Sequence, residues 1–231
     1  MRLFTYDYYE EIFQEALKRG YKVITLKEFF LDEYDKDEKI LVNRMDVDIR
    51  IDRLKEFYKI FKKLNIKASI YVRVHSPYYN LFSIGNILLI QDLLSLGCEI
   101  GIHTECKDLE SYCKSNTKEL LKVEIELFEK LFSTKIYGTA SHGDLTPNNN
   151  LDFWKEHSVE EFDLIYEAYD DKLWKHCRYV SDSEWTQWKA YENGVLLEND
   201  RRDPIEHLED NPKILHLLMH PESWYERYIY E

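Results

Sequence analysis

The stretch Ile40-Leu41-Val42-Asn43-Arg44-Met45-Asp46-Val47-Asp48 decides how the rest of this chain is interpreted. Its apolar beginning is typical of a buried strand, and it ends in two carboxylates. Residues two apart on a strand point to the same side, so Asp46 and Asp48 face one point and repel each other unless a cation lies between them. One carboxylate can then bind a metal ion while the other accepts a proton from water. A strand-end turn with two solvated aspartates is the alternative on spacing alone.

The composition limits the classes of protein to consider. At 231 residues, 44% of them hydrophobic, the chain is long enough for a substantial core. A formal net charge of −13 argues against a nucleic-acid partner and against binding to an anionic membrane surface. No apolar run approaches the roughly 20 residues that a transmembrane helix requires.

The cysteines and the first residues bear on the compartment. The four cysteines form no CxxC pair, which fits a reducing cytoplasm better than a disulfide framework. Residues 1–7 lack the apolar stretch of a signal peptide. We therefore expect a soluble cytoplasmic protein, although a mature chain trimmed of its leader would have the same appearance.

Hydrophobic periodicity predicts an alternation of helices and strands. Helices are expected over residues 8–19, 51–64, 81–96 and 118–131, with a helical turn over 26–30 and a short helix at the end of the chain. Besides the run that starts at Ile40, strands are expected over residues 21–25, 67–74, 99–103, 135–140 and 213–220. This order implies βαβ crossovers and a mainly parallel sheet or barrel. With no internal repeat and no linker, residues 1–231 are expected to form a single domain.

Polar residues follow four of these strands at the point where each strand ends, which is where α/β folds collect their chemistry. They are Asp46 with Asp48, then His103, His142 and His220. Any one of these histidines is more often a surface or core residue than a ligand. Together, two histidines and an aspartate give nitrogen and oxygen ligands suited to zinc or a similar divalent ion, with positions left open for water.

These motifs, in this order, resemble those of the polysaccharide deacetylase superfamily, also called NodB-homology or carbohydrate esterase family four. The likeness is to the branch whose first motif reads Arg-His-Asp-Val-Asp, and it covers nearly the whole chain. The matching segments are Gly20-Tyr21-Lys22, Arg44-Met45-Asp46-Val47-Asp48, Leu96-Gly97-Cys98-Glu99-Ile100-Gly101-Ile102-His103, Ala140-Ser141-His142-Gly143, Tyr179-Val180-Ser181-Asp182-Ser183 and His220-Pro221-Glu222-Ser223-Trp224. The resemblance implies an α/β fold, a distorted (β/α)7 barrel of the NodB-homology type.

The resemblance also implies a role for each matching residue. Asp46 corresponds to the general base, Asp48 and His103 to metal ligands, and His220 to the general acid. Asp182 is expected to pair with His220 Nδ1 and keep the imidazole protonated, although a solvated strand-end aspartate is an equal alternative.

One departure from the family pattern concerns the metal. The family usually has a second ligand histidine four residues after His103, where this chain has Lys107. His142, at the end of the next strand, is the preferred replacement. Glu105 is second, because it shares a side with His103 if the strand continues, and the Cys106 thiolate is third. Loss of the metal site is the remaining alternative.

Smaller departures surround the expected base. Met45 stands where the family has histidine, and the Arg-x-Pro motif that orients the base in many relatives is absent. Arg44 and Arg73 are the candidates to supply that positive charge.

The resemblance implies a metal-dependent hydrolase of an amide bond, a zinc deacetylase acting on an amino sugar or glycan precursor in surface polysaccharide biosynthesis. Aromatic side chains are candidates for stacking on sugar rings, with core packing as the alternative for each: Tyr78, Tyr79, Trp185 and Trp188. The rival interpretations are an inactive member that binds a glycan or a partner, and a hydrolase of an amide that is not a sugar. The residues leave open which sugar is used, whether an N- or O-acetyl group is removed, and the oligomeric state.

Overall fold

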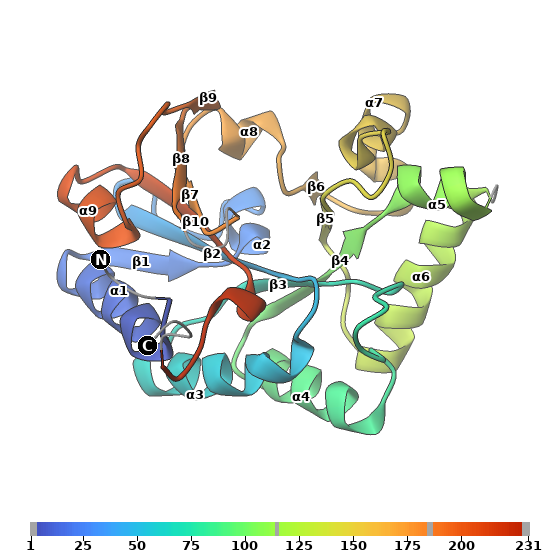
Figure 1. The fold of residues 1–231 in the computed structure, drawn as a ribbon, viewed down its shortest axis with the longest axis horizontal. Coiled ribbons are helices and arrows are strands. Elements are labelled where there is room, and N and C mark those ends of the chain that lie inside the picture. Colours follow the sequence, from blue (N-terminus) through green and yellow to red (C-terminus); the bar gives the residue numbers. More distant parts are fainter. Residues whose placement is uncertain (1–3, 114–115, 184–186, 228–231) are drawn as a thin grey trace.

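The architecture is a single strongly twisted sheet with helices packed along it (Figure 1). The computed structural model describes residues 4–113, 116–183 and 187–227. The strands in this part of the chain are β1 (Tyr21–Ile24), β2 (Lys39–Val47), β3 (Ser69–Val72), β4 (Glu99–Thr104), β5 (Gly138–Ser141), β6 (Tyr166–Glu167), β7 (Arg178–Ser181), β8 (Lys189–Glu192), β9 (Val195–Leu196) and β10 (Ile214–Met219).

Strand β2 organises the sheet because three strands pair with it. The order is β6-β5-β4-β3-β2-β10-β7-β8-β9, and the seven strands from β6 to β7 are all parallel. β10 pairs with β2 over residues 40–45, while on the other side β1 pairs with residues 39–42 and β3 with residues 44–47. Among the described residues, the antiparallel pairings are β7 with β8 and β8 with β9. The parallel sheet expected from the order of the elements is therefore confirmed.

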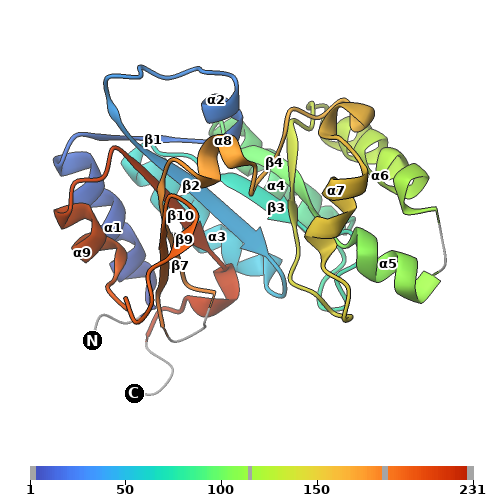
Figure 2. The ribbon, with the colours of Figure 1, turned by 90° about the horizontal axis from the view of Figure 1, so that it is seen from above.

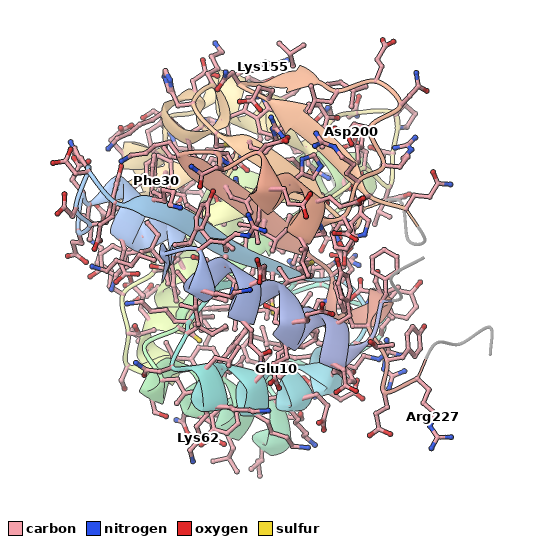
Figure 3. The ribbon with its side chains drawn as sticks, turned by 90° about the vertical axis from the view of Figure 1, so that its left-hand side faces the viewer. Glu10, Phe30, Lys62, Lys155, Asp200 and Arg227 are labelled. Atoms are coloured by element: carbon pink, nitrogen blue, oxygen red, sulfur yellow. The ribbon has the colours of Figure 1, made fainter. Side chains whose placement is uncertain are left out.

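Most helices form an outer layer along one face of this sheet. The α-helices are α1 (Tyr6–Lys18), α2 (Leu26–Phe30), α3 (Leu54–Leu64), α4 (Ile84–Ser95), α5 (Cys106–Cys113), α6 (Thr117–Phe132), α7 (Phe153–Glu156), α8 (Asp171–Trp174) and α9 (Pro204–Glu209). Of these, α2 and α8 instead contribute Leu26, Phe29 and Leu173 to the core on the other face. Short 3-10 helices are η1 (Ile51–Arg53), η2 (Asn150–Asp152), η3 (Val159–Phe162) and η4 (Pro221–Ser223). In Figure 2, α1 and α9 lie beside β10, whereas α5, α6 and α7 lie beside β4. Figure 3 shows Glu10 of α1 and Lys62 of α3 on the outside of the helical layer.

Alternation along the strands sorts the side chains onto two faces of the sheet. One set packs under the helices in an outer core that includes Ile12, Phe13, Leu41, Met45, Phe57, Phe61, Ile70, Ile100, Ile102, Leu215, Leu217 and Met219. The other set fills the concave face in an interior core that includes Ile24, Ile40, Val42, Tyr71, Ala140, Tyr166, Tyr179 and Leu218. Because Val42 faces the interior, residues 44, 46 and 48 face it too.

Aromatic side chains fill the side on which the barrel stays open. No ladder joins β6 to β7 among the described residues, so the sheet does not close by hydrogen bonds. Instead the ring of Tyr169, after β6, lies 6.4 Å from that of Tyr179 in β7. Trp174 contacts both rings, at 5.7 Å and 5.0 Å between centroids. The result is a distorted barrel with a packed interior.

From residue 106 onward the chain contains elements that the periodicity did not predict, namely α5, α7 to α9 and β6 to β9. Most of them have two to four residues, too few for a hydrophobic period to appear, and pairing with neighbouring strands defines the strands among them. The expected terminal helix is only the 3-10 turn η4. No helix in the described part of the chain has the length and apolar character needed to cross a membrane.

The packing of the interior can be tested at Gly101 in β4. A methyl group there would lie 2.5 Å from Cε1 of Tyr71 and 2.7 Å from the carbonyl oxygen of Gly138. The Tyr71 ring cannot swing away, because it is fully buried and its hydroxyl is bonded to Tyr166 at 2.6 Å. We therefore expect Gly101→Ala to lower the free energy of unfolding by about 1–3 kcal/mol, measured by urea denaturation.

The matched control is Gly85→Ala in α4, where an added methyl group meets nothing within 4 Å. There the expected change is between zero and a stabilisation of about 1 kcal/mol, because alanine favours helix. Equal stability of Gly101→Ala and wild type would contradict the close packing described for the interior.

Candidate active site and metal centre

Three side chains from different strands bring their ligand atoms together at the carboxyl end of the sheet. Asp48 follows β2, His103 lies in β4 and His142 follows β5. Asp48 Oδ1 lies 3.2 Å from His103 Nε2 and 3.7 Å from His142 Nε2. One ligand atom from each residue falls within 4.8 Å of the others, so the three form a possible Asp/His/His metal site.

The orientation of His103 fits a metal ligand. Its Nδ1 lies 2.8 Å from the carbonyl oxygen of Ala140, which leaves Nε2 without a proton in the neutral ring and aimed at Asp48. The buried Asp48 Oδ1 accepts no hydrogen bond from any described residue. A lone pair and a carboxylate this close repel each other unless a cation lies between them. A donor set of two imidazoles and one carboxylate suits zinc or a similar divalent ion.

The pKa values of the two histidines reflect the same electrostatic field. Burial alone would lower the pKa of His103, but the carboxylates of Asp46 and Asp48 raise it above its usual value. For His142, burial and the neighbouring His103 lower the pKa, so its ring favours the neutral form that binds metals. The negative charges of Asp46 and Asp48 therefore stabilise one positive charge between the side chains of Asp48, His103 and His142.

Of the other two candidates for the third ligand, Glu105 lies beside the cluster, with Oε1 3.9 Å from His142 Nδ1, and Cys106 lies away from it. Glu105 is buried in an ion pair with Arg73, at 2.6 Å between Oε1 and Nη2. Cys106 is buried in the outer core, on the helix side of the sheet. Lys107 forms surface ion pairs with Glu110 and Glu156, at 3.0 Å and 2.8 Å. Of the candidates for the third ligand, only His142 joins Asp48 and His103 in the cluster of possible metal ligands among the described residues.

Asp46 is held by a buried ion pair with Arg44, two residues earlier on the same face of β2. The contact is bidentate, with Nε 2.9 Å from Oδ1 and Nη2 2.6 Å from Oδ2. Burial would raise the pKa of the Asp46 carboxyl, but the Arg44 guanidinium, followed by His103 and His220, holds it below its ordinary value. Asp46 Oδ2 lies 3.6 Å from His103 Nε2, which places the carboxylate beside the metal cluster.

Three donors orient Asp182 beside His220 at the end of β10. His220 Nδ1 donates to Asp182 Oδ1 at 2.6 Å, and the His220 backbone N–H donates to the same carboxylate. Trp224 Nε1 adds a bond to Oδ2 at 2.9 Å. Burial opposes a charged ring, but the Asp182 carboxylate raises the pKa of His220 to about 10. The ring is therefore protonated at neutral pH, and its Nε2 is left to interact with a ligand.

A small pocket of about 60 Å³ adjoins these groups. It is lined by Asp48, Asp182, Ser183, His220, Glu222 and Ser223. Its volume is far below the roughly 300–1,000 Å³ of sites that enclose a whole drug-sized ligand. Only a substituent such as an acetamide or a hydroxyl fits inside, and the body of a larger ligand must stay outside.

The expected sugar-stacking aromatics have different environments. Trp188 is 5% exposed and packs in the outer core against Phe4, with ring centroids 5.0 Å apart. The Tyr79 hydroxyl ties the ends of β2 and β3 together, donating to Val47 O at 2.7 Å and accepting from Arg73 N at 2.8 Å. Tyr78 is 62% exposed. Trp185 lies outside the described residues.

Sequence reasoning missed two features of the site. It left the guanidinium of Arg44 unplaced, although the i, i+2 rule that paired Asp46 with Asp48 also puts Arg44 on the same face. It also gave no role to Glu222, which lines the pocket. Met45, which replaces a histidine of the family motif, points into the outer core and does not face the site.

Solved structures provide a relative for this architecture. The Streptococcus pyogenes deacetylase PplD, solved in complex with acetate, aligns over 96% of this chain and 87% of its own, with 14% sequence identity and a TM-score of 0.51. The two chains share a fold. The expectation of a distorted barrel of the NodB type is thereby confirmed, and at this identity the likeness concerns the fold alone.

Weaker matches come from Bacillus anthracis. BA3943, a CE4 family pseudoenzyme, aligns over 81% of this chain and 56% of its own, with 12% identity and a TM-score of 0.46. A family 4 carbohydrate esterase aligns over 88% of this chain and 74% of its own, with 12% identity and a TM-score of 0.45. This chain spans little more than half the length of BA3943. No family model and no curated protein matches the sequence.

The choice of the third ligand can be tested by metal analysis of purified variants. Changes to groups that merely orient a ligand already cost about 10–100-fold in affinity, so His142→Ala should lower zinc affinity by more than about 100-fold. Lys107→Ala is the matched control and should bind zinc like the wild type, because its ammonium group is paired at the surface. Full zinc content in His142→Ala together with its loss in Glu105→Ala would identify Glu105 as the ligand instead.

The Asp182–His220 pair predicts a pH dependence of stability. A histidine whose pKa rises from about 6.5 in the unfolded chain to about 10 in the fold stabilises the fold fully below pH 6.5. That contribution is lost as the pH rises towards 10. The difference in unfolding free energy between wild type and His220→Gln should therefore shrink between pH 6.5 and 10, measured by urea denaturation.

The same pH series in an Asp182→Asn background provides the control. Without the carboxylate the pKa of His220 falls, so His220→Gln should then cost a nearly constant amount across this range. An unchanged pH slope would show that Asp182 does not raise the pKa of His220.

Proposed function

We propose that this protein is a metal-dependent hydrolase that removes an acetyl group from an amino sugar or glycan precursor. The observation that carries the proposal is that an ionised carboxylate and a protonated imidazole lie beside the Asp48/His103/His142 cluster. Asp46 is kept ionised by Arg44, and His220 is kept protonated by Asp182. A carboxylate that accepts a proton and an imidazolium that donates one form the pair that amide hydrolysis requires.

The cluster and Asp46 together serve the attack on the acetyl group. When bound by Asp48, His103 and His142, a divalent ion supplies a Lewis acid that polarises the acetyl carbonyl and lowers the pKa of water. Asp46 takes the proton of the attacking water. Because Arg44 engages both carboxylate oxygens, Asp46 cannot rotate away, and its free lone pairs stay directed at the reacting centre.

His220 serves the departure of the amine. An amine leaves poorly as an anion, so the scissile nitrogen must gain a proton as its bond to the acetyl carbon breaks. The Asp182 contact fixes Nδ1 as a donor to the protein and leaves Nε2–H for the substrate nitrogen. The pKa of about 10 keeps this proton available over the physiological range.

The substrate that we infer is an acetylated amino sugar in a precursor of a surface polysaccharide. The size of the pocket supports it, because the acetamido group can enter while the sugar remains outside. Tyr78 is an exposed aromatic in the loop after β3, available to a pyranose face. The three buried cysteines, Cys98, Cys106 and Cys177, form no disulfide bond, which fits the intracellular location that we propose for this step. We also propose zinc as the metal and an origin in the Arg-x-Asp-Val-Asp branch of the superfamily.

The rival interpretation, an inactive binding protein, is supported by the departures at Met45 and Lys107. Met45 packs in the outer core, and Lys107 lies in ion pairs at the surface. Neither residue reaches the cluster, and His142 takes the place of the ligand that Lys107 does not supply. A protein that only binds a glycan does not require an ionised general base and a protonated general acid in its pocket. Their presence favours a hydrolase over a binding protein.

Rates on two substrates separate the proposed base from the proposed acid. Asp46→Asn preserves shape but cannot accept a proton, so turnover should fall by roughly 10²- to 10⁴-fold on both an acetamido sugar and an activated acetate ester. His220→Ala should reduce the amide reaction by a similar factor and affect the ester much less. An activated ester's leaving group departs without a proton, which is the physical reason for the difference.

Metal analysis of both variants is the control, because each should retain the zinc content of the wild type. Equal losses on amide and ester in His220→Ala would contradict its role as acid. If the wild-type protein binds zinc and hydrolyses cyclic amides but no acetylated sugar, the result would favour a hydrolase of amides that are not sugars.

A further inference from the structure

Glu222 is a buried carboxylate that has no task in the chemistry proposed above. It lies in η4, is 4% exposed and borders the pocket that Asp48 and His220 also line. Neither of its carboxylate oxygens receives a hydrogen bond from any residue in the described part of the chain. Its acceptors are therefore available to a ligand in the pocket.

The backbone around Glu222 is firmly held. Arg53 Nη1 donates to the carbonyl oxygens of Glu222 and Trp224, at 2.6 Å and 2.7 Å. The Ser223 N–H donates to the His220 carbonyl oxygen at 2.9 Å. The position of the side chain relative to His220 is thus set by the fold.

The arrangement is unfavourable in the free protein. A buried acceptor that lacks a donor loses its hydration without compensation. Asp48 and Asp182 add like charge around the same pocket, and the one cationic group there, His220, is already bonded to Asp182. A ligand that brings a hydrogen-bond donor into the pocket relieves this cost.

We propose that Glu222 is a specificity-determining residue that accepts a hydrogen bond from the substrate hydroxyl next to the scissile acetamide. This inference rests on the proposed function and deepens it. The scissile nitrogen must lie at His220. The acetamido group and the hydroxyl on the adjoining carbon then both point into the pocket while the sugar ring stays outside, and this hydroxyl is the donor that can reach Glu222. The preferred substrates are acetamido sugars whose adjoining hydroxyl is free, and a sugar substituted or deoxygenated at that carbon is rejected.

A cycle of two substrates and two proteins tests this interaction. The substrates are the methyl glycoside of N-acetylglucosamine and its 3-deoxy analogue, and the proteins are wild type and Glu222→Ala. Burial and the charge of Asp48 raise the pKa of Glu222 to about 7, so the rates are measured at about pH 8.5, where the carboxylate is ionised. Hydrogen bonds to a charged group change kcat/KM by about 10- to 100-fold, so the wild type should prefer the hydroxylated sugar by that factor. Glu222→Ala should lose most of this preference, with little change on the deoxy sugar. Glu226→Gln, at an exposed site four residues on, is the matched control and should keep the preference.

Thermal unfolding separates recognition from a structural role. Because Glu222 has no internal donor, Glu222→Gln should match the melting temperature of the wild type or exceed it by about 2–4 °C. A melting temperature several degrees lower in both Glu222→Gln and Glu222→Ala would assign the residue to the fold and overturn the proposal.

Binding of the same two glycosides to zinc-loaded protein, measured by calorimetry, distinguishes this inference from the proposed function. If neither sugar turns over but the hydroxylated one binds more tightly in a way that needs Glu222, the deacetylase function fails and the recognition role stands. If wild type deacetylates both sugars equally, the function stands and the role of Glu222 is overturned. Absence of both turnover and binding overturns the two together.

Discussion

The buried ion pair between Arg44 and Asp46 is the constraint around which the concave face of the sheet is organised. Both side chains are at most 2% exposed, and a charge at that depth is tolerated only when it is paired and bonded. The Arg44 guanidinium also lies 4.5 Å from the centre of the Tyr169 ring, among the aromatics that fill the open side of the barrel. The group that fixes the proposed base therefore also packs against the side chains that replace a strand ladder between β6 and β7.

Most of the other charged side chains at the site are paired within the protein, which leaves few groups available to a ligand. Arg73 neutralises Glu105, and Asp182 shares its charge with His220. Among the carboxylates that line the pocket in the described part of the chain, Asp48 and Glu222 have buried oxygens that accept no hydrogen bond. Asp48 faces the imidazoles of a possible metal site, and Glu222 faces the pocket beside the proposed acid. Asp48 would use its unpaired oxygen to bind a metal ion, and Glu222 would use its oxygens to bind a substrate hydroxyl.

The local pattern of the sequence was enough to predict the parallel α/β fold and the strand ends that carry Asp46, Asp48, His103, His142 and His220. This worked because strand alternation and the carboxyl-end rule depend only on spacing and direction. It was incomplete where the outcome depends on tertiary contacts. The sequence favoured His142 over Glu105 as third ligand, but it did not predict that Arg73, from a neighbouring strand, forms an ion pair with Glu105. The short strands after residue 160 have too few residues to show a period, and the role of Glu222 depends on the absence of a donor around it.

The proposed acid is coupled to the ends of the chain in a way that the proposed base is not. Trp224, fully buried, donates to Asp182 while its ring packs against Phe4 and Tyr9, at 5.4 Å and 5.3 Å between centroids. The backbone of Tyr225 in turn pairs with residues 4 and 6. Loosening of this terminal cluster would therefore remove one of the three donors that orient the Asp182 carboxylate beside His220. Asp46 would be spared, because Arg44 lies on its own strand and needs no contact with the termini.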